Sequence, residues 1–558
     1  MTLWHLWAPR TALCLGLLAG LTSISEAAPA KLSAAEARHL LARTGFSPTQ
    51  PEVEALTGQG AQRAVADLVE RAQAARPAHP APAFVAEPPP IPMNLLKTRE
   101  EQVAANQQQF REGLAIKTWW MREMLETRSP LAERMTLFWH SHFATSQQKV
   151  IRSQPMWVQH QLLRAHALGN FRTLLHAVAR DPAMLVYLDG ANSRKEAPNE
   201  NFAREVMELF TLGEATRSAE GLGGYTEQDI QQAARAFTGW SVDRRDFSFQ
   251  ARPAFHDAGS KTVLGRSGAF DGDAVLDVLL EQPAAARLVV GKLWKEFVSP
   301  APQGAAEQRE FDAVAKRFRD SGYDTAVALR ALLLTDAFWS TGNRGSLIKS
   351  PVELVVGTVR QFGFGATELV PFVLKSSQLG QNLLAPPNVK GWPGYTEWIN
   401  ATTLLERKRF TEQLFRAVEL KGESSAPPIA FGPSGQVGPS MNMGVGSEMA
   451  AGGMRPMQQM REEFGAETGG RGSNRQVLAL LGRDGILRVG QGMAKITFDP
   501  DAWLARYGGH ADRVPTDEVR QRLEQALLPV PATQAIPAGT VGVAYLRALT
   551  LDPAYQLK

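Results

Sequence analysis

The chain has 558 residues and a net charge of +4; 44% of its residues are hydrophobic and 21% are charged. This composition is typical of a globular protein with a sizeable core, and no block of Lys and Arg stands out. Nucleic acid is therefore a poor candidate partner. No glycine-rich loop followed by Lys and Ser or Thr indicates nucleotide binding.

The N-terminus is typical of a secretory signal peptide, which we place at residues 1–30. Arg10 precedes a short apolar run at 13–21, and small residues suitable for cleavage follow it. The run is too short to span a bilayer by itself, although an uncleaved anchor is the alternative. We therefore expect an exported protein, periplasmic or extracellular. Cys14 is the only cysteine, so cleavage would exclude cysteine nucleophiles and Cys-ligated zinc or iron–sulfur sites.

Helical periodicity dominates the rest of the chain. The fold class that we predict is mostly α, with a large multi-helix core domain over residues 31–421. Expected helices include 61–74, 100–125, 155–167, 170–180, 199–212, 227–238, 272–281, 283–297, 305–320, 324–335 and 350–362. Thr226 and Ser350 each begin a capping box, which predicts where two of these helices start. We find no convincing run of alternating strands.

Residues 422–474 interrupt this pattern. They are rich in Gly, Pro, Ser and Met, which predicts a disordered insertion. Six methionines between 441 and 460 offer an alternative, a copper(I) carrier, because thioethers are soft ligands. Order returns in the C-terminal segment, 475–558, which we expect to be helical and to pack back on the core.

The stretch 199–213 reads as one short helix with a polar face. Asn199 is a good N-cap and Gly213 a good C-terminal stop. The simple interpretation of the polar face is a solvated surface. The functional interpretation is a cleft wall with paired catalytic carboxylates and two binding residues; the four side chains are Glu205, Glu208, Asn201 and Arg204.

Three histidines are candidate metal ligands. His140 and His142 end a predicted helix; in an extended segment both rings would point to one side, whereas on a helix they would diverge by about 200°. His256 could complete the site, with Asp257 in an orienting or catalytic role and Glu205 as ligand or general base. Such a set would suit a divalent metal such as zinc or iron. The alternatives are histidines bonded to loop backbone and a loop ion pair at Asp257.

Aromatic residues cluster in a Gly/Pro-rich loop that begins at Pro386. Trp392, Tyr395 and Trp398 could stack on a sugar or a peptide. The alternative is that they pack the loop against the helical core.

Several motifs together resemble a bacterial family called domain of unknown function 1800. One of them is Phe138-Trp139-His140-Ser141-His142-Phe143. Others lie at 37–46, 199–213, 225–240, 256–265, 349–353, 386–392 and 551–557. The resemblance implies a largely helical, exported bacterial protein. It also implies a partner from another exported family, similar to sulfatases and alkaline phosphatases. It implies no reaction.

Two function hypotheses follow. In the first, a polar cleft carries out metal-dependent chemistry, hydrolytic or oxidative, on an envelope or extracellular substrate. In the second, the protein is a non-enzymatic binding or scaffold protein for an exported partner or polymer. The second predicts exposed aromatic residues and histidines that are buried in satisfied hydrogen bonds. The sequence leaves the choice between enzyme and binding protein open.

Overall fold

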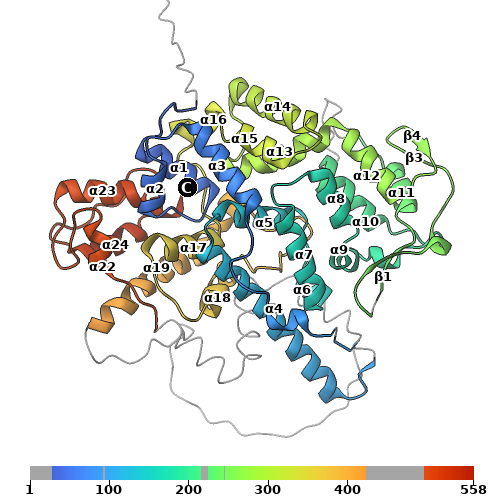
Figure 1. Ribbon diagram of the computed structural model, residues 1–558, viewed down its shortest axis with the longest axis horizontal. Helices are drawn as coiled ribbons and strands as arrows, with labels where there is room; N and C mark the ends of the chain where they lie inside the picture. The colour runs from blue at the N-terminus through green and yellow to red at the C-terminus, as the bar shows by residue number, and fades with distance from the viewer. Residues whose placement is uncertain (1–27, 89, 92–94, 215–223, 244, 423–494) are drawn as a thin grey trace, which may run out of the picture.

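The computed structural model describes residues 28–88, 90–91, 95–214, 224–243, 245–422 and 495–558 (Figure 1). Within these ranges the fold is mostly helical, as predicted, and the strands form two short hairpins. Residues 1–27 of the predicted signal peptide, Cys14 among them, and residues 423–474 of the predicted insertion lie outside the described residues. None of the described helices has the length and the apolar character needed to cross a membrane.

The N-terminal third surrounds one central helix, α5 (Pro130–His142), which the ribbon diagram places in the middle of the molecule (Figure 1). The helices before it are α1 (Ala34–Thr44), α2 (Gln50–Leu56), α3 (Ala61–Ala74) and α4 (Arg99–Glu126). The helices after it are α6 (Gln147–Val150), α7 (Ser153–Ala165), α8 (Phe171–Ala179) and α9 (Pro182–Tyr187).

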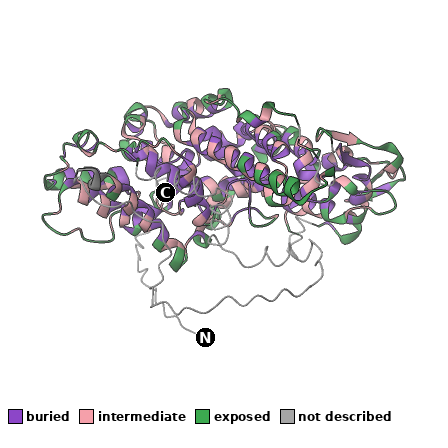
Figure 2. Ribbon diagram, turned by 90° about the horizontal axis from the view of Figure 1, so that it is seen from below, coloured by how far each residue is buried: buried purple, intermediate pink, exposed green. Residues whose placement is uncertain are grey.

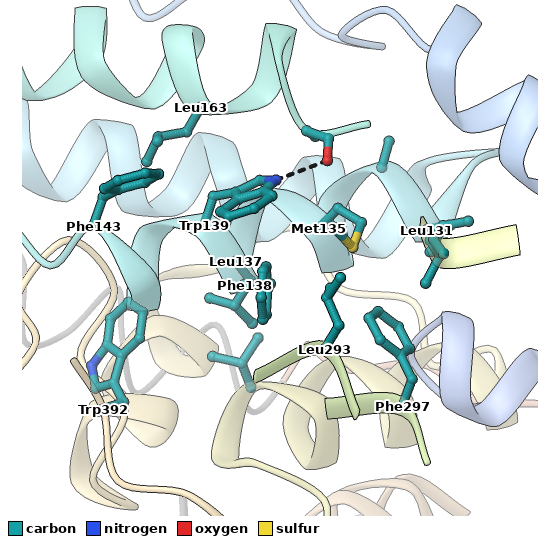
Figure 3. Close-up of a cluster of buried hydrophobic side chains, with 14 of the residues drawn as sticks. Leu131, Met135, Leu137, Phe138, Trp139, Phe143, Leu163, Leu293, Phe297 and Trp392 are labelled. Atoms are coloured by element: carbon teal, nitrogen blue, oxygen red, sulfur yellow. Dashed lines mark hydrogen bonds between the residues drawn. The ribbon is translucent and has the colours of Figure 1, made fainter. Parts of the chain in front are cut away.

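The whole of α5 between Leu131 and His140 is buried. Its apolar side chains pack among those of α7 and α13, and the Trp139 indole N–H donates to the Ala167 carbonyl at 2.8 Å (Figure 3). A helix enclosed on all sides can hold a charge only when that charge is paired. Glu133 accordingly accepts two hydrogen bonds from Arg164, at 2.7 and 2.9 Å.

The middle of the chain differs from the prediction in its helix type. The expected helix at 199–212 begins at Asn199 as predicted, but α10 (Glu200–Glu205) continues as a π-helical segment, η4 (Val206–Leu212). Thr211 stabilises the wider turn, because its hydroxyl donates to the Val206 carbonyl five residues earlier, at 2.8 Å.

Two hairpins follow α11 (Glu227–Ala236). They pair β1 (Trp240–Val242) with β2 (Phe249–Ala251), and β3 (Lys261–Val263) with β4 (Arg266–Gly268). Strands of three residues are too short to show an alternating pattern, which explains why the sequence did not reveal them. The capping box predicted at Thr226 is confirmed at the start of α11.

The second half of the chain is again helical. It comprises α12 (Gly272–Glu281), α13 (Pro283–Phe297), α14 (Gly304–Asp320), α15 (Thr325–Leu332), α16 (Asp336–Trp339), α17 (Pro351–Phe362), α18 (Val370–Gln378) and α19 (Ala401–Gly422). The capping box predicted at Ser350 is confirmed at the start of α17.

The last described residues, 495–558, lie against this core. They form α22 (Pro500–Ala505), α23 (Asp517–Leu527) and α24 (Gly542–Leu551), drawn in red beside the blue α1 and α2 (Figure 1). The Lys349 amide donates to the Gln556 carbonyl at 2.8 Å, and Gly365 pairs with Thr497. Figure 2 shows the resulting elongated body, with buried residues along its interior.

Candidate functional site

A cleft of about 220 Å³ lies at the C-terminal end of α5, and four of the predicted site residues meet there. These are His142, Trp392, Tyr395 and Trp398. We name it the Trp392 cleft. Its other polar residues come from α5, α13, the start of α17, the loop between α18 and α19, and the last residue. They are Arg134, Ser141, Lys292, Lys295, Glu296, Ser350, Glu353, Gln381, Lys390 and Lys558.

Gly391 fixes the aromatic loop against α5. Its φ is +90°, and a Cβ at this position would lie 2.3 Å from the Ser141 carbonyl oxygen, so only glycine fits. The next residue, Trp392, donates its backbone N–H to the Ser141 hydroxyl at 3.3 Å. The indole of Trp392 therefore stands beneath the end of α5 (Figure 3).

The three loop aromatics differ in exposure. Trp392 and Trp398 are 8% and 5% exposed, and Tyr395 is half-buried in the short helix η7 (Tyr395–Trp398). The exposed aromatic surface predicted for a binding protein is therefore wrong for the two tryptophans. The buried Trp392 still has one hydrogen-bond donor to offer, because its Nε1–H has no hydrogen-bond partner among the described residues.

His142 and Lys292 form the basic floor of the cleft. The Lys292 ammonium donates to His142 Nδ1 at 2.9 Å. An ammonium group can only donate, so Nδ1 is unprotonated and the neutral ring carries its proton on Nε2. Burial, and then the Lys292 charge, lower the pKa of His142 well below its usual value, while the nearby Phe210 backbone opposes that shift. Nε2 makes no hydrogen bond.

The π-helical segment supplies the second partner of this lysine. Lys292 also donates to the Leu209 carbonyl, at 3.0 Å. π-Helical turns change the intrahelical bonding pattern and occur frequently at functional sites. Burial lowers the pKa of Lys292 to about 8, so the ammonium is still mostly charged at pH 7.

The remaining charges of the cleft are largely paired. Arg134 binds Glu353 at 2.6 Å and also contacts Glu296, and Lys558 binds Glu353 at 2.5 Å. Lys390 pairs with a carboxylate outside the cleft, Glu214, at 2.6 Å.

Two lysines of the cleft have no carboxylate partner among the described residues. They are Lys292 and Lys295, three residues apart on α13. Lys295 is exposed, and its Nζ reaches the aromatic loop near Gly394. The cleft therefore carries an excess of positive charge, with one unpartnered indole donor beside it.

His140 does not point into this cleft. Because α5 continues to His142, the extended geometry predicted for the two histidines is wrong, and their rings diverge. The His140 ring stacks on Trp120 at 5.7 Å and lies 5.5 Å from Trp392, and neither of its nitrogens has a hydrogen-bond partner. Burial lowers its pKa to about 4. The binding-protein hypothesis predicted histidines whose ring nitrogens are all hydrogen-bonded, and His140 does not fit that prediction.

His256 and Asp257 belong to a separate loop. The His256 Nδ1 lies 3.0 Å from the Thr238 carbonyl, and Asp257 binds Arg235 at 2.7 Å. The hydrogen bond from Arg235 lowers the pKa of Asp257 to about 2. Across the described ranges, no three His, Cys, Asp or Glu side chains are grouped closely enough to hold a metal ion. The predicted ligands are thus not brought together, and the metal site stays a prediction.

The carboxylates Glu205 and Glu208 do lie near each other, on the polar face that the helix geometry predicted. Burial and the charge of Glu208 raise the pKa of Glu205, while Arg204 and Lys390 oppose the rise. Arg204 is engaged in a bidentate pair with Glu227, at 2.6 and 2.8 Å, and Asn201 is exposed. Glu205 and Glu208 do not line the Trp392 cleft, but both interact electrostatically with Lys390, which does.

Sequence reasoning missed the basic residues of the cleft. Lys292 and Lys295 occupy one side of a helix that is otherwise rich in Ala, Val and Leu. Two lysines at i, i+3 are the ordinary pattern of a solvated helix face. Only tertiary packing shows that one of them reaches the end of α5.

The chain matches the family model described as "Protein of unknown function (DUF1800)" over residues 39–557. It therefore belongs to that family, which confirms the resemblance drawn from its motifs. No curated protein and no solved structure matches the chain.

Proposed function

We propose that this protein is an exported binding protein that holds a small anionic group, a carboxylate, phosphate or sulfate, in the Trp392 cleft. Export is supported by the signal-peptide pattern of residues 1–30. The resemblance to a family with sulfatase-like or phosphatase-like partners makes such a partner a further prediction. This proposal develops the binding alternative, and metal-dependent catalysis remains the competing prediction.

The observation that carries the proposal is the unpaired charge on α13. Lys292 and Lys295 face the cleft without a carboxylate partner among the described residues, and Trp392 adds an unpartnered N–H. A buried donor without an acceptor costs free energy, and an anion that fills this position recovers it. Charge-assisted hydrogen bonds from ammonium groups are among the stronger ones in proteins.

The ammonium group of Lys292 is held in place before any anion binds. The Leu209 carbonyl and His142 Nδ1 occupy two of the three donor directions of the Lys292 ammonium. The third direction is left for a ligand. A preorganised ammonium loses little conformational entropy on binding, which favours affinity for a small ion.

Calorimetric titration with phosphate, sulfate and acetate tests the proposal. Lys292→Gln and Trp392→Phe each remove one donor and keep the approximate shape of the side chain. We expect each to weaken anion binding by about tenfold, the effect of one charge-assisted hydrogen bond. The matched control is Lys316→Gln, a surface lysine paired with Asp320, which should leave the affinity unchanged. Absence of binding, or equal affinity in all variants, would overturn the proposal.

A further inference from the structure

A second and larger cavity, of about 800 Å³, lies between the first hairpin and the turn after α6. We name it the Arg194 groove. Residues from three parts of the chain line it, within 150–155, 185–194 and 239–255. It shares no lining residue with the Trp392 cleft. Its volume falls within the range of small-molecule sites, about 300–1,000 Å³.

Backbone strain is concentrated in this groove. Among the described residues, eight non-glycine residues have positive φ, and three of them line the groove: Ile151 at 66°, Asp189 at 58° and Phe247 at 57°. For a β-branched residue such as Ile151 this conformation is a genuine outlier. Strained residues of this kind persist only where the surrounding structure holds them, and they cluster at active sites and ligand sites.

Three arginines of the groove form no ion pair with a carboxylate among the described residues, but Arg152 faces the charge of Glu112. Burial lowers the pKa of Arg152, and that charge opposes the shift. Arg152 also donates one Nη2 bond to the Ile91 carbonyl at 3.0 Å, while its Nη1 is buried without a hydrogen-bond partner. The Arg194 guanidinium lies 4.4 Å from the centre of the Phe255 ring, a stacked position that leaves its N–H edge available. Arg252 is exposed at the rim.

The carboxylates of the groove are already paired. Asp189 binds Lys149 at 2.7 Å, and Asp243 binds Arg245 at 2.6 Å and accepts from Gln250 at 2.8 Å. Because Glu112 faces Arg152, the guanidiniums of Arg194 and Arg252 give the groove its net positive charge. Guanidinium groups match planar carboxylates in a bidentate manner.

We propose that the Arg194 groove binds an oligosaccharide that carries carboxylates. The guanidiniums of Arg194 and Arg252 take the acid groups. Asn192 and Gln250 offer amides for the ring hydroxyls, and the half-buried Phe247 lines the same cavity as an apolar surface. The strained backbone holds these groups in place before the ligand arrives.

Other anionic polymers fit less well. Strand addition by an acidic peptide needs an extended sheet edge, and β1 and β2 have three residues each. A nucleic acid carries a negatively charged phosphate on every nucleotide. Some of these phosphates would lie close to the negative carboxylates of Asp189 and Asp243, which would repel them. Carboxylates that alternate with neutral hydroxyls suit a groove with mixed charge.

The test is titration of the protein with trigalacturonate, its neutral methyl ester and triglutamate. We expect trigalacturonate to bind, and Arg194→Gln and Arg252→Gln each to raise its Kd by about tenfold, the effect of one bidentate pair. The ester should bind at least about tenfold more weakly than the acid, for the same reason. Because both arginines are exposed, their variants should melt at the temperature of the parent.

Two controls separate this proposal from its alternatives. Arg266→Gln removes a surface arginine paired with Glu281 and should leave binding unchanged. Trp392→Phe should leave the effect of the Arg194 and Arg252 substitutions on the affinity unchanged, because that residue belongs to the other site. No binding of trigalacturonate, equal binding of its ester, tighter binding of triglutamate, or unchanged affinity in both groove variants would each overturn the proposal.

Discussion

Lys292 Nζ lies 2.9 Å from His142 Nδ1, and this contact joins α13 to the last residue of α5. It requires a neutral histidine and a charged lysine at the same time. Burial keeps His142 neutral by lowering its pKa. Burial also lowers the pKa of Lys292 to about 8, so this lysine is charged at neutral pH but loses its proton at moderately alkaline pH. The charge in the cleft is therefore sensitive to moderately alkaline pH.

Anion binding should accordingly weaken as the pH rises through about 8. Lys292 loses its charge there, whereas an ordinary lysine keeps it to about 10.5. Phosphate, sulfate and acetate titrations between pH 6 and 9.5 check this. Sulfate is the cleanest probe, because its own charge is constant over the range. In Lys292→Gln the remaining affinity should not change through pH 8, and a drop retained in that variant would assign the titration to another group.

The Gly391→Ala variant should be strongly destabilised. The added Cβ meets the Ser141 carbonyl, and the residue must keep a φ of +90°. We expect a loss of more than about 2 kcal/mol in the free energy of unfolding, measured by urea denaturation. The matched control is Gly58→Ala, where φ is +84° and no atom lies within 4 Å of the added Cβ. Equal losses in the two variants would show that the contact with α5 contributes nothing.

Removal of the Glu353 charge should destabilise the core. Burial alone would raise the pKa of this carboxyl, but Arg134 and Lys558 outweigh it and lower the pKa to about 2. Glu353→Gln removes the one fully buried carboxylate of the cluster and leaves Arg134 and Lys558 with only the partly exposed Glu296, at a cost of up to about 3–5 kcal/mol in chemical denaturation. The control Glu281→Gln breaks the exposed pair with Arg266 and should cost less than about 1 kcal/mol.

The same carboxylate predicts a pH dependence. Because its folded pKa is lower than the unfolded value of 4.5, the stability that it contributes is full above that value. It is lost as the pH falls towards about 2. The slope of stability against pH below 4.5 should be smaller in Glu353→Gln than in the parent.

His140→Phe should reduce the loss of stability on mild acidification. The folded pKa of His140 is lowered from 6.5 to about 4, so between these values the unfolded chain binds a proton that the folded chain does not. Stability therefore falls as the pH drops through this window, and a phenyl ring between Trp120 and Trp392 removes that contribution. The control His510→Phe, at an exposed position, should keep the parental slope. An unchanged slope in His140→Phe would contradict the burial of a neutral ring.

The sequence predicted the helices better than it predicted the site. Local signals sufficed where the structure is local, as at Ser350 and Thr226, whose capping boxes form as expected. The sequence did not identify α5 as the central helix, because its charged residues resemble those of a helix at the protein surface. Only the folded structure shows that Arg134 is buried and paired with residues far away in the chain. The stretch from Asn199 was predicted as one regular helix, yet it becomes π-helical from Val206 on.

The candidate site was only partly predictable. Trp392 and its loop were singled out as aromatic residues in a rigid turn, and they do line the cleft. The histidines were read as a pair, but the helix continues through His142 and separates them. Lys292 gave no signal, since its role comes from contacts with residues 83 and 150 positions away in the chain.

The most direct test of the proposed function is anomalous diffraction from crystals grown with millimolar selenate, a sulfate analogue whose selenium atom can be located. We expect one peak in the Trp392 cleft, within hydrogen-bond distance of Lys292 Nζ and the Trp392 indole nitrogen, and a clearly weaker peak in Lys292→Gln crystals at the same selenate concentration. Selenium found only elsewhere on the protein, or a peak of equal height in that variant, would contradict the proposed function.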